Sequence, residues 1–154
     1  RKKIDEIDWQ DFQNQIETSQ KGFLNLLNIF TPNMRKENFG RFITVGTNLF
    51  QNPVVPYHDY TCAKAGLLSI TRTAAMELGE FNITVNMISG GLLKLTDASE
   101  GTPEEVFDYI KSITPLRKVT TTKDFSDAVL FFASPWSRAV TGQNLIVDGG
   151  LVLN

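Results

Sequence analysis

Two residues with complementary chemistry, Tyr60 and Lys64, stand four positions apart in a stretch with a helical pattern. At that spacing both side chains project from the same face of a helix, about one turn apart. A phenol with a pKa of about 10 is a poor acid or base at neutral pH, but a neighbouring ammonium favours the phenolate. The pair can therefore form a general acid with a shifted pKa. Most such pairs are ordinary surface residues, so the spacing alone does not establish an enzyme.

A residue with a hydroxyl group precedes this pair in the sequence. Thr47 ends a short run of β-forming residues, 41–47, and lies thirteen residues before Tyr60. Open α/β sheets place their ligands at the carboxyl ends of strands. The Thr47 hydroxyl could donate a hydrogen bond to a substrate carbonyl. A threonine selected only for its strand propensity explains the residue equally well.

The amino-terminal part has the pattern of one long helix at about 8–30. Its apolar residues advance in steps of three, four and seven, which is the spacing of one helix face. Ser19 is the one polar member of this stripe. The apolar members are Trp9, Phe12, Ile16, Phe23, Leu26 and Phe30.

Strands and helices alternate over the rest of the chain. Gly79 is a plausible helix stop, and Thr102, Pro103 and Glu105 form the pattern of an N-cap, a first-turn proline and a capping-box glutamate. Strands joined by helices imply right-handed crossovers and a parallel sheet covered on both faces, so the fold class is α/β. The predicted strands are 41–47, 83–88 and 144–147, and the predicted helices are 57–78, one through Val106 and Ile110, and 123–133.

Composition argues against several classes of function. The chain has 154 residues, and 15 Lys+Arg against 17 Asp+Glu leave a formal charge of -2. This balance argues against nucleic acid or an anionic membrane as the main partner. No apolar run approaches the ~20 residues of a membrane span. Cys62 is the only cysteine, so no internal disulfide can form. We expect one soluble, cytoplasmic domain without a metal site.

Four stretches resemble successive landmarks of the short-chain dehydrogenase/reductase family. They stand in the family's order, and the resemblance runs from about residue 8 to the carboxyl terminus. Within the family the chain is most similar to 3-oxoacyl-acyl-carrier-protein reductases and bacterial hydroxysteroid dehydrogenases. The implied fold is a Rossmann-like, doubly wound parallel sheet. The landmark stretches are 40–45, 60–66, 83–86 and 141–150.

This resemblance implies an NAD- or NADP-dependent oxidoreductase that reduces a carbonyl or oxidises an alcohol. Tyr60 would donate a proton to the substrate carbonyl, and Thr47 would take the place of the family's serine. Lys64 would lower the pKa of the tyrosine and hold the nicotinamide ribose. Gly90 and Gly91 would face the cofactor. A 3-oxoacyl thioester of fatty-acid biosynthesis, delivered by acyl carrier protein, is the candidate substrate.

The resemblance also implies a lid and an assembly. Residues 92–101 would form a substrate lid. The helices at 8–30 and 57–78 would pack against their copies in a homodimer or homotetramer.

Some positions depart from the family's pattern. Ser19 stands where the family has an asparagine that completes a proton relay, and Thr47 keeps the hydroxyl of the usual serine. Gly90 and Gly91 replace the usual Pro-Gly, which should leave the loop looser. These departures leave a non-catalytic subunit or an inactive relative as an alternative.

A second tyrosine offers another alternative. Tyr57 lies seven residues before Lys64, which resembles the longer spacing of bacterial enoyl-acyl-carrier-protein reductases, and the stretch 89–91 also resembles some of those enzymes. The distance from Thr47 favours Tyr60. His58, between the two tyrosines, is predicted to be a loop residue.

The family's glycine-rich turn, whose backbone approaches the cofactor pyrophosphate, has no counterpart before residue 8. We therefore interpret residues 1–154 as the carboxyl-terminal part of a single domain, without its amino-terminal cofactor-binding half. The three predicted strands would be the last three of the family's sheet. Strand 41–47 should then present an open edge.

Overall fold

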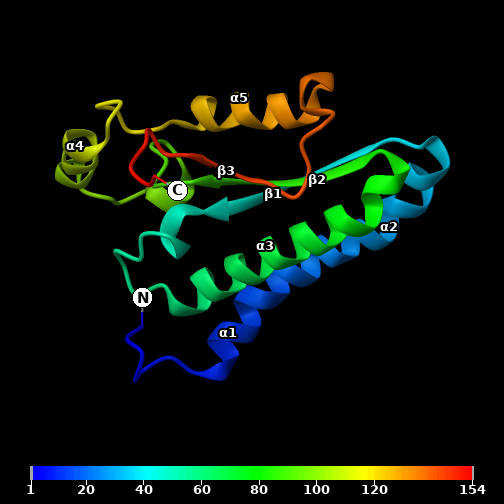
Figure 1. Ribbon diagram of the computed structural model, residues 1–154. Coiled ribbons are helices and arrows are strands. Elements are labelled where there is room, and N and C mark those ends of the chain that lie inside the picture. The colour runs from blue at the N-terminus through cyan, green and yellow to red at the C-terminus, as the bar shows by residue number, and fades with distance from the viewer. Residues whose placement is uncertain (1, 154) are drawn as a thin grey trace.

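The computed structural model describes residues 2–153 as helices and parallel strands that alternate along the chain (Figure 1). The order of strands and helices after residue 40 is the predicted one. The elements are α1 (Trp9–Ile16), a π-helical turn (Glu17–Lys21), α2 (Gly22–Glu37), β1 (Gly40–Thr47), α3 (His58–Leu78), β2 (Ile83–Gly90), α4 (Glu104–Ile113), α5 (Thr122–Ala133) and β3 (Asn144–Val147).

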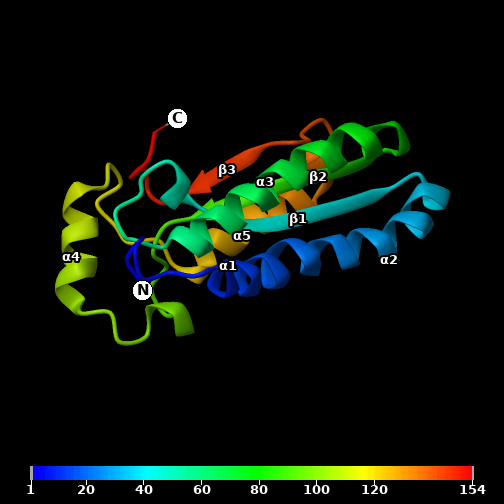
Figure 2. The ribbon, with the colours of Figure 1, turned by 90° about the horizontal axis from the view of Figure 1, so that it is seen from below.

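The three strands form one parallel sheet in the order β1-β2-β3. Its pairing brings Thr47 beside Gly90 at the carboxyl end of β1 and Gly90 beside Val147 at the end of β3. Helices α1, α2 and α3 lie on one face and α5 on the other, and α4 lies beyond the carboxyl ends of the strands (Figures 1 and 2). The predicted α/β class with a covered parallel sheet is confirmed.

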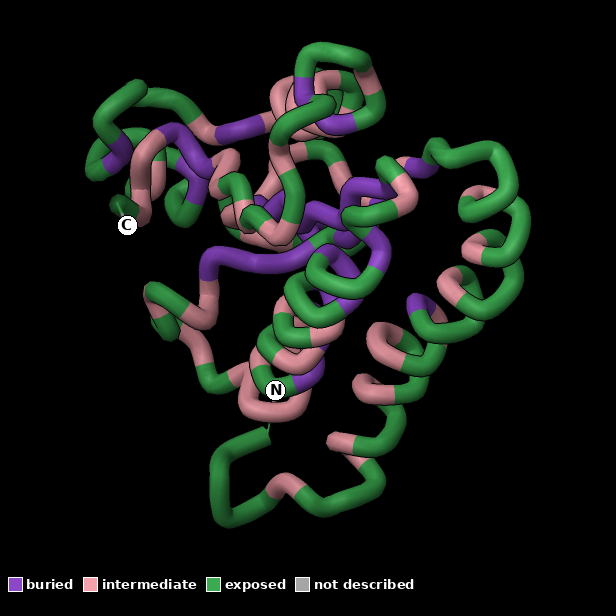
Figure 3. Tube along the Cα trace, turned by 45° about the vertical axis from the view of Figure 1, so that its right-hand side comes forward, coloured by how far each residue is buried: buried purple, intermediate pink, exposed green. Residues whose placement is uncertain are grey.

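The core lies between the sheet and α3, with the start of α2 packed beside it. Every residue of β2 is buried, as expected for a central parallel strand covered on both faces. The Phe23 ring of α2 packs edge-on against Phe42 of β1, with 6.0 Å between ring centroids. Buried positions follow the strands and the inner turns of α3, whereas α1 and α2 are mostly exposed or half-buried (Figure 3). The core cluster is Phe23, Phe42, Leu67, Ala74, Ala75, Leu78, Ile83, Val85 and Met87.

Strand β1 is an edge strand, as predicted. Within the described residues, β2 is its only partner, and Val45 on β1 is 51% exposed. A parallel strand without a partner on one side is unusual in folds of this class, because such strands are normally paired on both sides and covered on both faces.

The amino-terminal helix is longer than the predicted 8–30. It continues to Glu37 and ends where Asn38 takes a left-handed conformation, with φ of 48°. Pro32 lies inside α2 and does not stop it, although proline removes one helical hydrogen bond. Midway, residues Glu17–Lys21 form a π-helical turn that apolar periodicity does not reveal.

Helix α3 ends at Leu78 with Gly79 at its C-cap, so the predicted helix stop is confirmed, and Asn82 then turns the chain in a left-handed conformation with φ of 57°. Two boundary predictions need correction. Helix α4 starts at Glu104 after Pro103, which has no side-chain cap, so the predicted N-cap at Thr102 is wrong. Strand β2 extends through Gly90, which is therefore not a loop residue.

Candidate active site

The end of β1 and the start of α3 bring Thr47, Tyr60 and Lys64 together. Thr47 is the last residue of β1 and is 5% exposed, and its hydroxyl also accepts a hydrogen bond from the Leu49 amide. Tyr60 lies in the first turn of α3, where the nearby Thr47 hydroxyl acts to lower the pKa of its phenol. The Lys64 ammonium lies 5.7 Å from the centroid of the Tyr60 ring. The predicted constellation of hydroxyl, phenol and ammonium is present.

Lys64 is anchored to the strand that carries Thr47. Its Nζ donates a hydrogen bond of 2.8 Å to the carbonyl oxygen of Val45. An ammonium has three donors, so this bond leaves two for other acceptors such as vicinal hydroxyls. Burial lowers the pKa of Lys64, because the surroundings solvate the charged form less well than water does.

The pKa of Tyr60 differs from the expectation based on Lys64. Burial raises the pKa of the phenol, the Thr47 hydroxyl opposes this, and the Tyr57 phenol raises it further. The expected lowering by a nearby ammonium is not seen, and the Lys64 amine is bound to Val45 instead. In this state Tyr60 is a neutral proton donor at pH 7.

Tyr57, the alternative tyrosine, stands at the N-cap position of α3, just outside the helix. Its ring meets that of Tyr60 edge-on, with 5.9 Å between centroids. His58 is the first residue of α3 rather than a loop residue. Both line a cavity of about 540 Å³ between the loop after Pro53 and the first two turns of α3. Its lining residues do not include Thr47, Tyr60 or Lys64.

Ser19 lies half-buried in the π-helical turn. Its neighbour Gln20 makes the contact with α3: Gln20 Nε2 donates a hydrogen bond of 3.2 Å to the carbonyl of Ala63, the residue before Lys64. Gly66 makes room for this contact, because a Cβ at that position would lie 2.2 Å from Gln20 Nε2. The sequence pattern selected Ser19, whereas the contact belongs to Gln20.

The glycines at the end of β2 are held in place by packing. A Cβ at Gly90 would lie 3.3 Å from the Phe125 ring of α5. A Cβ at Gly91 would lie 3.1 Å from the side-chain nitrogen of Asn48 and 3.3 Å from Cβ of Asp148. The side chains of Asn48 and Asp148 are hydrogen-bonded to each other. Neither residue was predicted from the sequence as a site residue. The available signals were that Asn48 follows Thr47 directly and that Asp148 lies in the landmark stretch 141–150.

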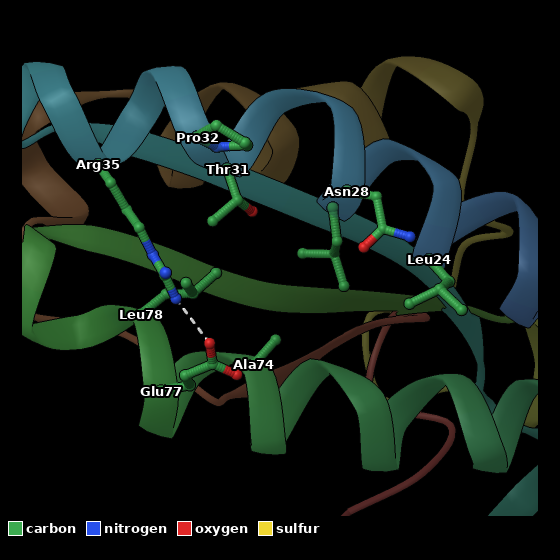
Figure 4. Close-up of a pocket in the computed structure, with 9 residues that line it drawn as sticks. Leu24, Asn28, Thr31, Pro32, Arg35, Ala74, Glu77 and Leu78 are labelled. Atoms are coloured by element: carbon green, nitrogen blue, oxygen red, sulfur yellow. Dashed lines mark hydrogen bonds and ion pairs between the residues drawn. The ribbon is translucent and has the colours of Figure 1, made fainter.

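A second hollow lies away from these residues. It occupies about 400 Å³ between α2 and the last turns of α3, and an ion pair of 2.6 Å between Arg35 and Glu77 crosses it (Figure 4). Tyr60 stands at the opposite end of α3, so this groove is not part of the candidate active site. Its other lining residues are Leu24, Leu27, Asn28, Thr31, Pro32, Ala74 and Leu78.

The described part of the chain has neither a candidate metal site nor a candidate membrane-spanning helix. Residues 2–153 contain no group of three His, Cys, Asp or Glu side chains placed to hold a metal ion. No helix over the same range has the length and apolar character needed to cross a bilayer.

With this geometry in place, comparison with known proteins assigns the family. A family model described as "Enoyl-(Acyl carrier protein) reductase" matches residues 1–152. The chain belongs to the short-chain dehydrogenase/reductase family. Two 3-oxoacyl-[acyl-carrier-protein] reductases are similar to it, one from Staphylococcus epidermidis at 28% identity and one from Thermotoga maritima at 32%. A 7alpha-hydroxysteroid dehydrogenase from Escherichia coli is 34% identical.

These relatives are longer than the chain. The aligned part covers 94% of the chain but 59% of the Staphylococcus protein and 58% of the Thermotoga protein, and for the Escherichia coli dehydrogenase the shares are 91% and 55%. A crystal structure of a Brucella melitensis 3-oxoacyl-[acyl-carrier protein] reductase superposes with a TM-score of 0.89 at 24% identity. The superposition covers 99% of this chain and 57% of the Brucella protein, which supports the Rossmann-like family fold.

Proposed function

We propose that the protein is an NAD(P)-dependent carbonyl reductase of the short-chain dehydrogenase/reductase family, with Tyr60 as its proton donor. One observation supports this most: Thr47 ends a parallel strand beside Tyr60, and Lys64 lies one turn further along the same helix with its ammonium 5.7 Å from the Tyr60 ring. Residues 1–154 are, in this proposal, the carboxyl-terminal part of one domain in a longer, cytoplasmic protein. The open edge of β1 and the greater length of the relatives support this interpretation.

The residues present fit a nicotinamide cofactor at this end of the sheet. When bound, the cofactor would supply a hydride to the substrate carbon. Lys64 would hold its ribose hydroxyls with the donors that Val45 leaves free. Gly90 and Gly91, at and after the end of β2, would face the cofactor. Ser19 is assigned to the proton relay through its place in the π-helical turn beside α3.

Proton donation is the task of the chain's own residues. Thr47 would donate its hydroxyl proton in a hydrogen bond to the substrate carbonyl oxygen, which orients the carbonyl toward Tyr60. The Tyr60 hydroxyl then gives its proton to that oxygen as negative charge develops there. Both groups come from rigid elements, the end of a strand and the first turn of a helix, so their placement costs little reorganisation. A 3-oxoacyl thioester, carried by acyl carrier protein in fatty-acid biosynthesis, is the proposed substrate.

The pH profile tests the pairing of Thr47 with Tyr60. Reduction needs the protonated phenol, so kcat should fall as pH rises through the pKa of Tyr60. The Thr47 hydroxyl acts to lower that pKa. Thr47→Ala should therefore move the alkaline limb of the kcat profile to higher pH and lower its plateau, whereas Thr47→Ser should keep both close to wild type. An unshifted limb in Thr47→Ala would contradict the assignment.

Enoyl thioester reduction is a second candidate. The matching family model carries that description, and the Tyr57 ring lies against Tyr60 beside the same cavity. In that reaction Tyr57 would be the proton donor, paired with Lys64. The two candidates differ in which tyrosine matters and in which thioester is consumed.

The chain alone should not bind the cofactor. We expect no saturable binding of NADH or NADPH to the 154-residue chain in fluorescence titrations, because the pyrophosphate and adenosine contacts would come from the rest of the domain. Saturable binding in the low micromolar range would show that the chain contains a cofactor site of its own.

Assembly should cover the outer face of α1 and α2. Several large apolar side chains are exposed there, and a patch of that kind marks an interface on a soluble protein. We expect light scattering on the full-length protein to give a homodimer or homotetramer at micromolar concentration. A well-behaved monomer would contradict this proposal. The exposed residues are Trp9, Leu26, Ile29 and Phe30.

A further inference from the structure

A buried polar contact joins the ends of two strands that are not neighbours. Asn48, the residue after Thr47, donates a hydrogen bond of 2.9 Å from Nδ2 to Oδ2 of Asp148, the residue after β3. Asn48 is 4% exposed and Asp148 5%. Strand β2 separates β1 from β3 in the sheet, so the contact crosses the end of the central strand.

The Asp148 carboxylate organises the turn that follows it. Oδ1 accepts hydrogen bonds of 3.0 Å from the amides of Gly150 and Leu151, and Oδ2 accepts one of 3.1 Å from Val152. Among residues 2–153 no cationic side chain forms an ion pair with the Asp148 carboxylate, and Asn48 is the one side chain that is hydrogen-bonded to it. A buried carboxylate must be fully hydrogen-bonded, so loss of Asn48 would leave part of it unsatisfied.

Gly91 makes this crossing possible. A Cβ there would lie 3.1 Å from Asn48 Nδ2 and 3.3 Å from Asp148 Cβ, inside ordinary contact distance of both partners. The φ of Gly91 is not positive, so space rather than backbone conformation explains the glycine. Gly91, the residue after β2, thus has a local role within this chain.

The same turn also reaches the segment after α4. The carbonyl of Gly149 accepts a hydrogen bond of 3.1 Å from the Leu116 amide. A Cβ at Gly150 would lie 3.1 Å from the Pro115 ring, so this glycine packs directly on that segment. The Asp148 turn therefore connects the strand end that bears Thr47 with the segment that follows the carboxyl end of α4.

We propose that Asn48 and Asp148 are positioning residues, which hold the end of β1 so that the Thr47 hydroxyl stays aligned with Tyr60. The bond fixes the backbone immediately after Thr47, while the amide of Leu49 fixes the Thr47 hydroxyl itself. This inference rests on the proposed function and adds two residues to it. Small displacements of a reacting group can lower rates by up to about a hundredfold, so a buried anchor at this point matters.

The test is a set of kinetic measurements on the full-length protein with acetoacetyl-coenzyme A, a small 3-oxoacyl thioester. We expect Asn48→Ala to lower kcat about tenfold or more and to leave the KM for NADPH or NADH nearly unchanged. If Asn48 acts through Thr47, the double variant with Thr47→Ala should have nearly the kcat of Thr47→Ala alone, because coupled residues are not additive. Asn48→Ser serves the same comparison if Asn48→Ala does not fold.

The control is Thr71→Val, which removes a different buried bond, that of 3.0 Å between the Thr44 and Thr71 hydroxyls. It should lower the melting temperature without lowering kcat per folded molecule. An unchanged kcat in the Asn48 variants, or losses that multiply in the double variant, would overturn the positioning role while the wild-type enzyme remains active. An inactive wild type would instead overturn the proposed function and this inference with it.

Discussion

Replacing Tyr60 by phenylalanine in the full-length protein should lower kcat by about a hundredfold or more. Only the hydroxyl is lost, and general-acid catalysis contributes about 10²–10⁴-fold. The ring contacts of Tyr60 with Tyr57 and Lys64 would remain, so the fold should be preserved. Cofactor affinity should stay nearly unchanged, because the loss falls on the transition state. Steady-state rates and a fluorescence titration of NADPH and NADH measure the two effects separately.

Tyr57→Phe is the matched control. It removes the same atom from the neighbouring ring at the edge of the same cavity. We expect it to cost far less than Tyr60→Phe with a 3-oxoacyl thioester. The reverse order would leave the family assignment intact and transfer the proton-donor role to Tyr57.

Lys64→Met should damage both turnover and cofactor binding. The change removes the ammonium that would hold the ribose hydroxyls, and also the anchor to the Val45 carbonyl beside Thr47. We expect kcat to fall at least about a hundredfold and the dissociation constant of the cofactor to rise about tenfold or more, since a hydrogen bond to a charged group contributes about 1.5–3 kcal/mol. Calorimetric titration of the cofactor and steady-state kinetics test both parts.

Arg72→Met is the control for a lost positive charge on the same helix, two turns further along and exposed to solvent. It should leave both quantities close to wild type. If Lys64→Met weakened turnover alone, Lys64 would act only on Tyr60 and the ribose-holding role would be wrong.

The architecture was largely predictable from the sequence because its signals are local. Short β-rich runs and helical periodicity placed every strand, and 144–147 matches β3 residue for residue. The errors fall where local pattern is weak. The helix predicted over 8–30 in fact continues through Pro32 to Glu37, where α2 packs on β1. The left-handed turn after α3, at Asn82, has no glycine to mark it, since asparagine also tolerates that conformation.

The candidate site was predictable only in part. Tyr60 and Lys64 are four residues apart, so helix geometry alone places them together. The Asn48–Asp148 bond joins residues 100 positions apart, and no periodicity indicates such a contact. The raised pKa of Tyr60 was also not predictable, because burial depends on the packing of the whole chain.

The most direct test of the proposed function is the rate of nicotinamide oxidation by the full-length protein with two thioesters in parallel, acetoacetyl-coenzyme A and crotonyl-coenzyme A. Carbonyl reduction through Tyr60 predicts turnover of the 3-oxoacyl thioester, little turnover of the enoyl thioester, and loss of the activity in Tyr60→Phe. Turnover of the enoyl thioester alone, or an activity that survives Tyr60→Phe, would contradict it.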